Sequence, residues 1–323
     1  IEALFHPFMA LMIGLSVLIT VWIGGKLTIE NKIEAGNITE FILYVYKLTW
    51  PFASLGWVTS LIQRASASQK RINEFLNTKT NIINFNTTEY KLLGNIQFNN
   101  VSFTYPENNI TALKNISFKL NAGQTLGITG SVGSGKTALL NLITRNYDCT
   151  SGEILIDDLS LKKHNINVVR NNLAIVPQDV FLFSDTIYNN IVFGLNNHSI
   201  NEVVEYAKKS AVHSNIINFK DKYETVVGER GVTLSGGQKQ RITIARALIT
   251  KPQILILDDC LSAVDVETEE EIIKNLKQEM QNKTCVIVSH RLSSIKHADL
   301  ILYLKDGEII ESGTHQELLH LNK

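Results

Sequence analysis

The chain has 323 residues, enough for roughly two domains, which excludes a small scaffold held together by disulfides. It carries 31 Lys and Arg against 31 Asp and Glu, so its net charge of zero gives no electrostatic reason to expect a nucleic-acid partner. Its three cysteines lie far apart in the sequence and favour neither a disulfide framework nor a zinc site.

The first quarter of the chain is predicted to cross a membrane. Residues 7–25 carry no charge. At about 1.5 Å per residue they span roughly 28 Å, close to the ~30 Å thickness of the hydrocarbon layer. A second apolar stretch, 41–63, contains Lys47 and Pro51, which membrane helices tolerate when they pack against neighbours. The alternative is a pair of buried soluble helices, which is disfavoured because such long helices normally have a polar face.

Charges beside the second stretch indicate its orientation. Arg64, Lys70 and Arg71 follow it, and the positive-inside tendency places the chain from about residue 64 onward in the cytoplasm. The chain starts with Ile1 rather than Met and is interpreted as a fragment of a longer protein.

The remaining sequence divides into a linker and an α/β domain. Residues 72–94 are rich in Asn and Thr and lack sustained periodicity, so we expect a linker there. Within 95–323, short apolar runs typical of strands alternate with helical segments, which predicts a parallel sheet. Asp306-Gly307, between two apolar runs, predicts a hairpin turn near the end.

Residues 130–137 read GSVGSGKT and match the pattern of a phosphate-binding loop, between an expected strand and an expected helix. Glycines let successive backbone N–H groups face phosphate oxygens, Lys136 supplies a cation, and the Thr137 hydroxyl suits Mg²⁺. The residues that we expect to bind the nucleotide here are Gly130, Ser131, Gly133, Ser134, Gly135, Lys136 and Thr137.

Two carboxylates end the buried-strand pattern ILILDD. Beside a phosphate loop, Asp258 is suited to holding Mg²⁺ and Asp259, one step on, to facing the attacking water. Seen alone, the pair could equally be a strand end followed by a helix cap.

The sequence LSGGQ at 234–238 predicts a second anion site. Ser235, Gly236, Gly237 and Gln238 would open a helix and present free N–H groups at its positive end. The presence of two anion sites in one chain raises the question of whether both contact the same nucleotide.

These motifs together resemble the nucleotide-binding domain of ATP-binding cassette (ABC) transporters, from about Asn95 to Leu321. With residues 1–71 as the last two transmembrane helices, the chain is similar to the end of a half-size bacterial exporter of the multidrug and lipid type. The resemblance implies an α/β P-loop domain with a helical subdomain, preceded by all-α transmembrane helices. It implies a multi-pass protein of the cytoplasmic (inner) membrane, with the nucleotide-binding domain in the cytoplasm.

The same resemblance implies that two such domains meet head to tail, with each ATP and its Mg²⁺ between the phosphate loop of one chain and the LSGGQ of the other. Tyr105 resembles the aromatic residue that stacks on adenine. Gln178 resembles the glutamine that senses Mg²⁺ and the membrane domain, and His290 the histidine that reaches the γ-phosphate. Residues 262–265 resemble the loop that contacts the other subunit, and 229–231 a segment that couples exporter domains.

Asp259 departs from the family, which usually has Glu at this position. One methylene less withdraws the carboxylate by about 1.5 Å, and a misplacement near 1 Å can cost ~10²-fold in rate. We therefore expect a weak ATP site on this chain's own loop and favour a heterodimer with a second half-transporter over a homodimer.

Three functions remain open at this point. An ATP-driven exporter is favoured by the fused apolar segments, although its transported substrate is not readable from the sequence. A soluble cassette ATPase acting on nucleic acid or ribosomes is disfavoured by residues 7–25. A regulatory subunit that binds ATP with little hydrolysis is the alternative that Asp259 favours.

Overall fold

The computed structural model describes residues 2–84, 86–195, 198–228, 233–261 and 264–320. The chain divides into two compact units, Ile1–Thr80 and Asn81–Lys323. We describe each unit by itself and call them the helical unit and the nucleotide-binding unit.

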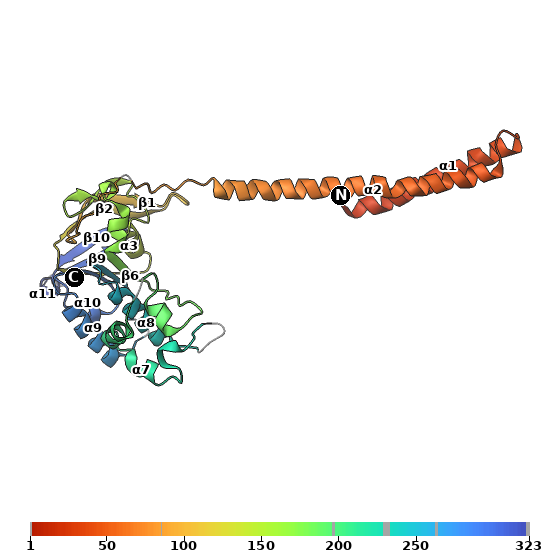
Figure 1. The fold of residues 1–323 in the computed structure, drawn as a ribbon. Helices are drawn as coiled ribbons and strands as arrows, with labels where there is room; N and C mark the ends of the chain where they lie inside the picture. Colours follow the sequence, from red (N-terminus) through yellow and green to blue (C-terminus); the bar gives the residue numbers. More distant parts are fainter. Residues whose placement is uncertain (1, 85, 196–197, 229–232, 262–263, 321–323) are drawn as a thin grey trace. The chain divides into compact units, whose positions relative to one another are not determined.

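The helical unit is a hairpin of two long helices, α1 (Glu2–Ile29) and α2 (Ala35–Leu76) (Figure 1). A side chain at Gly24 would place its Cβ 2.8 Å from Cγ1 of Ile38, so the missing side chain lets the two helices approach closely. Residues 72–76, expected to be linker, continue α2, because Lys70 and Glu74 form a pair one turn apart and Gln69 donates a hydrogen bond to Asn73.

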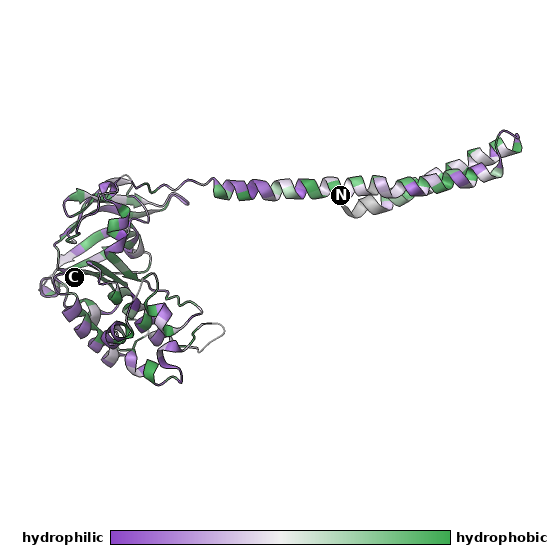
Figure 2. Cartoon of the chain, viewed as in Figure 1, coloured by the Kyte–Doolittle hydropathy of each residue, from purple (hydrophilic) through white to green (hydrophobic). Residues whose placement is uncertain are grey.

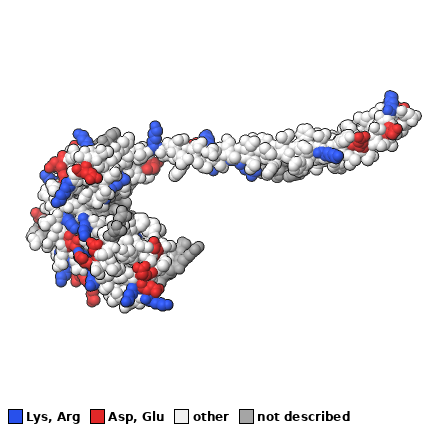
Figure 3. All heavy atoms as spheres, viewed as in Figure 1, with Lys and Arg blue, Asp and Glu red and all other residues white. Residues whose placement is uncertain are grey.

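The apolar surface of the helical unit lies on the outside of its helices. In α1, Pro7–Ile29 is long and apolar enough to cross a membrane, and only 6% of its most apolar window is buried. Figure 2 shows white and green residues along α1, and Figure 3 shows few charged side chains on this unit. Among the described residues α2 does not pass the same test, so the second span stays a prediction.

The nucleotide-binding unit contains two sheets. The smaller is antiparallel, in the order β2-β1-β4-β5. The larger has the order β10-β9-β3-β8-β7-β6, in which β10 alone is antiparallel, joined to β9 through the predicted Asp306-Gly307 turn. The strands are β1 (Ile96–Thr104), β2 (Thr111–Leu120), β3 (Thr125–Gly130), β4 (Ser151–Ile156), β5 (Leu159–Ser160), β6 (Leu173–Val176), β7 (Ile254–Asp258), β8 (Thr284–Val288), β9 (Leu300–Lys305) and β10 (Glu308–Gly313).

Helices cover both faces of the larger sheet, so β7 is buried on both sides. Ile254 and Ile256 join the core that contains α3, whereas Leu255 and Leu257 join the core under α8 and α9. A largely helical segment is inserted between β6 and β7, as the expected helical subdomain requires, and the predicted fold class is confirmed. The described helices are α3 (Lys136–Ile143), α4 (Ile166–Asn171), α5 (Ile187–Ile191), α6 (Ile200–Lys209), α7 (His213–Ile217), α8 (Gly236–Ile249), α9 (Val266–Glu279), α10 (Leu292–Ile295), α11 (His315–His320) and the short 3-10 turns η1 (Leu161–Lys163) and η2 (Lys222–Glu224).

The second half of the expected linker lies within this unit. The Asp157 carboxylate accepts backbone N–H groups from Leu93 (2.6 Å), Gly94 (2.9 Å) and Asn95 (2.8 Å). Tyr90 is hydrogen bonded to the buried His164. The polar composition of this segment therefore serves contacts with the domain as well as solvent.

Candidate nucleotide site

The carboxyl ends of four neighbouring parallel strands, β3, β8, β7 and β6, form one edge of the larger sheet. Asp258 is in register with Val288 of β8, which in turn is in register with Ile128 of β3. The backbone N–H of Asp259 also donates to the Val288 carbonyl at 2.9 Å. Because loops leaving this edge share the crevice beside it, the fold directs several of the predicted side chains to one region. They are Lys136, Gln178, Asp258, Asp259 and His290.

The phosphate loop follows β3 and leads into α3, as the sequence predicts. The Lys136 ammonium donates to the carbonyl oxygens of Gly130 (2.9 Å) and Ser131 (2.8 Å), so the side chain lies across the loop. Gly130 has φ +152°, and a Cβ there would be 2.2 Å from the Leu304 carbonyl oxygen. Only glycine fits this position, and its absence of a side chain keeps the backbone close to β9.

The loop contains a polar atom that fits a phosphate ligand. Ser134 is 2% exposed, and its buried hydroxyl has no hydrogen-bond partner among the described residues. An ideal Cβ on Gly130 would lie 2.8 Å from this oxygen, so the hydroxyl sits against the start of the loop. An unpaired buried hydroxyl costs free energy, which a phosphate oxygen would recover by accepting its proton in a hydrogen bond.

Charges at the end of β7 face the lysine of the loop. Burial lowers the pKa of Lys136, although Asp258 and Asp259 both act to raise it. Burial, and then the Asp259 charge, raises the pKa of Asp258, while Lys136 opposes this. Two crowded carboxylates beside a phosphate loop fit Mg²⁺, which proteins commonly hold through one or two carboxylates together with substrate phosphates.

Tyr105 lies directly after β1, half-buried in an aromatic cluster. Its ring packs edge-on against Phe103 (centroids 4.7 Å apart) and Tyr147 (5.4 Å). Thr104, the last residue of β1, is in register with Thr111, the first residue of β2. The residue after Thr111 is Ala112, and its carbonyl oxygen lies 2.6 Å from the position that a Cβ on Gly135 would occupy. The aromatic cluster therefore neighbours the phosphate loop, where a base could stack.

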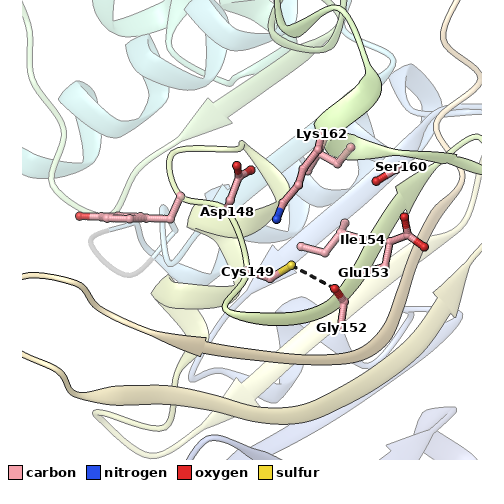
Figure 4. A pocket seen from close by; sticks show the side chains of 9 residues that line it. Asp148, Cys149, Gly152, Glu153, Ile154, Ser160 and Lys162 are labelled. Atoms are coloured by element: carbon pink, nitrogen blue, oxygen red, sulfur yellow. Dashed lines mark hydrogen bonds between the residues drawn. The ribbon is translucent and has the colours of Figure 1, made fainter. Parts of the chain in front are cut away.

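Beside Tyr147 is a separate hollow of about 360 Å³, into which the Lys162 ammonium points (Figure 4). The Cys149 thiol there donates to the Gly152 carbonyl oxygen at 3.5 Å, and burial raises the pKa of this thiol. No residue of the phosphate loop lines the hollow, so we do not include it in the nucleotide site.

The LSGGQ sequence begins α8, and Ser235 caps it. The Ser235 hydroxyl accepts the Gln238 backbone N–H at 3.3 Å, and the Gln238 side-chain oxygen accepts the Ser235 backbone N–H at 2.9 Å. The side chains of Ser235 and Gln238 are thus both used in the helix cap. Gly236 and Gly237 form the first turn, where N–H groups have no partner within the helix.

The structure does not join this cap to the phosphate loop of the same chain. No hydrogen bond or ion pair links residues 130–137 to residues 235–238, all of which are described. Gln178 and His290 are exposed at the sheet edge. Residues 229–231, and 262–263 of the expected partner-contacting loop, lie outside the described residues.

Sequence reasoning missed one buried group close to the site. Glu269, in the first turn of α9, is 2% exposed and accepts hydrogen bonds from Arg291 and two serines. The acidic run around Glu269 looks like a solvated helix face, so only the spatial neighbours reveal the buried carboxylate.

The larger sheet, its phosphate loop and the inserted helices define a P-loop nucleotide-binding domain. Residues 113–262 match the family described as ABC transporter. The nucleotide-binding unit therefore contains, over these residues, the domain described as ABC transporter, which confirms the predicted resemblance and implies ATP binding.

Relatives match along nearly the whole chain. The multidrug resistance-like ATP-binding protein MdlA of Buchnera aphidicola subsp. Schizaphis graminum is 43% identical over 320 residues, which cover 99% of this chain and 55% of that protein. The probable multidrug resistance ABC transporter ATP-binding/permease protein YheI of Bacillus subtilis is 41% identical over 323 residues, 100% of this chain and 55% of that protein.

A solved structure, of a bacterial Atm1-family ABC exporter with ATP bound, matches with a TM-score of 0.76 and 34% identity, covering 90% of this chain and 52% of that one. The chain thus spans about half the length of its relatives. Together with the apolar helix α1, these matches support a membrane-associated protein, as the sequence predicts.

Proposed function

We propose that this chain is part of an ATP-driven exporter. The observation that carries the proposal is a phosphate loop facing two carboxylates at one sheet edge, in a chain that also contains the unburied apolar helix α1. Residues 1–71 would be the last two transmembrane helices, 72–94 the linker and 95–323 the nucleotide-binding domain. The exporter would be a multi-pass protein of the cytoplasmic membrane, with this domain in the cytoplasm.

ATP binds on the chain's own loop in this proposal. Backbone N–H groups of residues 130–135 and the Lys136 ammonium hold the phosphates, and the Ser134 hydroxyl gains a partner. Tyr105 stacks on the base. Thr137, Asp258 and Gln178 would hold Mg²⁺, which when bound supplies positive charge to the phosphates during transfer.

Two residues at the sheet edge act on the attacking water and the terminal phosphate. Asp259 directly follows β7, where its carboxylate can accept a proton from the water. His290 directly follows Ser289, whose N–H donates to Ile128 of β3 at 3.1 Å, so it starts from a fixed backbone position near the loop.

A second copy or a related half-transporter completes the site. The cap at Ser235 is exposed and unlinked to the phosphate loop of its own chain, which supports its use on the nucleotide of a partner. Closing such a head-to-tail dimer would switch the membrane helices from inward to outward facing, and hydrolysis would reopen it.

The short carboxylate of Asp259 favours a heterodimer. A partner with a longer base at its own loop would carry most of the hydrolysis, and this chain's Ser235 would serve that stronger site. A regulatory role, in which this chain binds ATP and hydrolyses little, is the alternative function that the same residue supports.

The exporter proposal is tested with the full-length protein in inside-out membrane vesicles. ATP should drive accumulation of a fluorescent amphipathic dye, and Lys136→Ala should abolish it. ATP hydrolysis by a protein that washes off the membrane would contradict the exporter assignment, and stable ATP binding without hydrolysis in any assembly would favour the regulatory alternative.

A further inference from the structure

A buried carboxylate connects two loops of the proposed site. The Oε2 atom of Glu269 accepts a hydrogen bond from the Arg291 guanidinium at 2.6 Å. Its Oε1 atom accepts the hydroxyl protons of Ser294 (2.6 Å) and Ser293 (3.1 Å). Both oxygens of the side chain are therefore engaged, all by residues that follow His290 in the sequence.

The same guanidinium also reaches the segment after Asp259. Its Nη1 atom is 3.4 Å from the Leu261 carbonyl oxygen and 3.3 Å from that of Val264. Leu261 directly precedes the segment that resembles the partner-contacting loop, and Val264 belongs to it. Arg291 thus contacts the backbone at these two residues and the first turn of α9 at once.

His290 is held from both neighbours. On one side, the Ser289 N–H donates to Ile128 of β3. On the other, the Arg291 N–H donates to the Ser289 hydroxyl at 3.0 Å, and the Arg291 side chain ends on Glu269. Arg291 therefore joins the backbone that carries His290 to the buried carboxylate of Glu269.

The carboxylate is kept charged despite its burial. Burial acts to raise the pKa of Glu269, but hydrogen bonds from Ser294, Arg291 and Ser293 outweigh it, so the pKa lies below its usual value. An ionised buried acid with three donors is a rigid anchor, because moving any donor leaves a buried charge partly unsatisfied.

We propose that Glu269 and Arg291 are a positioning pair, which keeps His290 in register with Asp259 and with the backbone at Leu261 and Val264. This inference rests on the proposed ATPase function. Neither residue touches ATP.

The test is Glu269→Gln in the full-length transporter, which keeps the shape of the side chain and removes its charge. We expect kcat for ATP to fall by about tenfold to 10²-fold, as expected for misplaced catalytic groups, while KM and affinity for a fluorescent ATP analogue change by less than about twofold. Arg291→Lys, which keeps the charge but loses the planar fork, should give a smaller fall in kcat.

The matched control is Glu279→Gln, at the other end of α9. Glu279 forms an ion pair of the same length with Lys209 (2.6 Å), but it touches neither loop. Both Gln variants are expected to lower Tm, whereas only Glu269→Gln lowers kcat. If Glu269→Gln does not fold, Arg291→Lys is compared with the control instead.

Equal kcat in Glu269→Gln and Glu279→Gln, with active wild type, would overturn the positioning pair and leave the ATPase proposal intact. A parallel loss of ATP-analogue affinity would also overturn it, because the pair would then serve the fold of the loop. Absence of hydrolysis in the wild type and in Asp259→Glu would instead reject the ATPase proposal itself.

Discussion

The phosphate loop and the turn that begins α8 both place glycines at the N-terminus of a helix, yet their side chains are satisfied to different degrees. In the loop, Lys136 binds the loop's own carbonyls and the Ser134 hydroxyl is left inside without a described partner. At α8, Ser235 and Gln238 satisfy each other, and the turn is exposed. The phosphate loop therefore keeps a buried hydroxyl that a ligand bound to the same chain could satisfy. At the start of α8 the two side chains satisfy each other, so only the exposed face of the turn is available to a ligand.

The largest expected effect is that of Lys136→Ala. Because the ammonium is the charged donor of the loop, we expect affinity for a fluorescent ATP analogue at this chain's site to fall more than about 10²-fold. Lys162→Ala, which alters the neighbouring hollow instead, should bind normally. Retained affinity for the ATP analogue in Lys136→Ala would show that the phosphate loop is not the nucleotide site of this chain. The contrast with the turn at α8 would then no longer hold.

Ser235→Ala should separate the two regions most sharply. ATP-analogue affinity at this chain's loop should be unchanged, while hydrolysis of the assembled transporter falls by about tenfold to 10²-fold, because a donor to the partner's nucleotide is lost. The control is Ser199→Ala, which removes an equivalent capping box from α6 and costs about 1 kcal/mol of stability without the loss of hydrolysis. Equal loss in both variants would mean that Ser235 acts only as a helix cap.

Asp259→Glu is expected to raise steady-state ATP turnover of the protein expressed alone by about tenfold or more. The longer side chain would bring the carboxylate within reach of the attacking water. Asp258→Glu, which lengthens the neighbouring carboxylate, should not accelerate turnover. Brisk hydrolysis in the wild type with no gain in Asp259→Glu would show that the shorter acid suffices and would remove the reason for favouring a heterodimer.

The smallest effect is expected for Tyr105→Ala. Loss of a ring that stacks on the base should weaken ATP-analogue binding by about fivefold, which corresponds to roughly 1 kcal/mol. Tyr105→Phe keeps the ring and should bind like the wild type. Weakened binding in both variants would point to the Tyr105 hydroxyl rather than to stacking.

Local patterns allowed the motifs and the fold class to be predicted. The phosphate loop depends on glycine positions within eight residues, and the hairpin at Asp306-Gly307 on a single turn, so sequence spacing is sufficient for both. The alternation of strands with helices predicts a parallel sheet, and the carboxyl ends of parallel strands lie at the same edge of the sheet.

Contacts between distant segments could not be predicted in the same way. The acidic residues around Glu269 predict a solvent-exposed helix face. Its hydrogen-bond partners, however, lie at α10, which is separated from α9 in the sequence by the strand β8. Similarly, the polar composition of the expected linker was readable from the sequence, but the acceptance of two of its N–H groups, those of Leu93 and Gly94, by Asp157 was not. Such partners are set by the packing of the chain, for which a single sequence contains no local signal.

The cap of α8 has a consequence for which residues position 235 can accept in evolution. The Ser235 oxygen accepts the Gln238 N–H, while its own proton stays available for an acceptor outside the helix. Asp is an equally good cap, but it would turn a negative charge toward an incoming phosphate, and Ala would lose both bonds. If the proposed function holds, substitutions that a helix start normally tolerates would be excluded at position 235, and the reason would be the ligand that the turn meets rather than the stability of the helix.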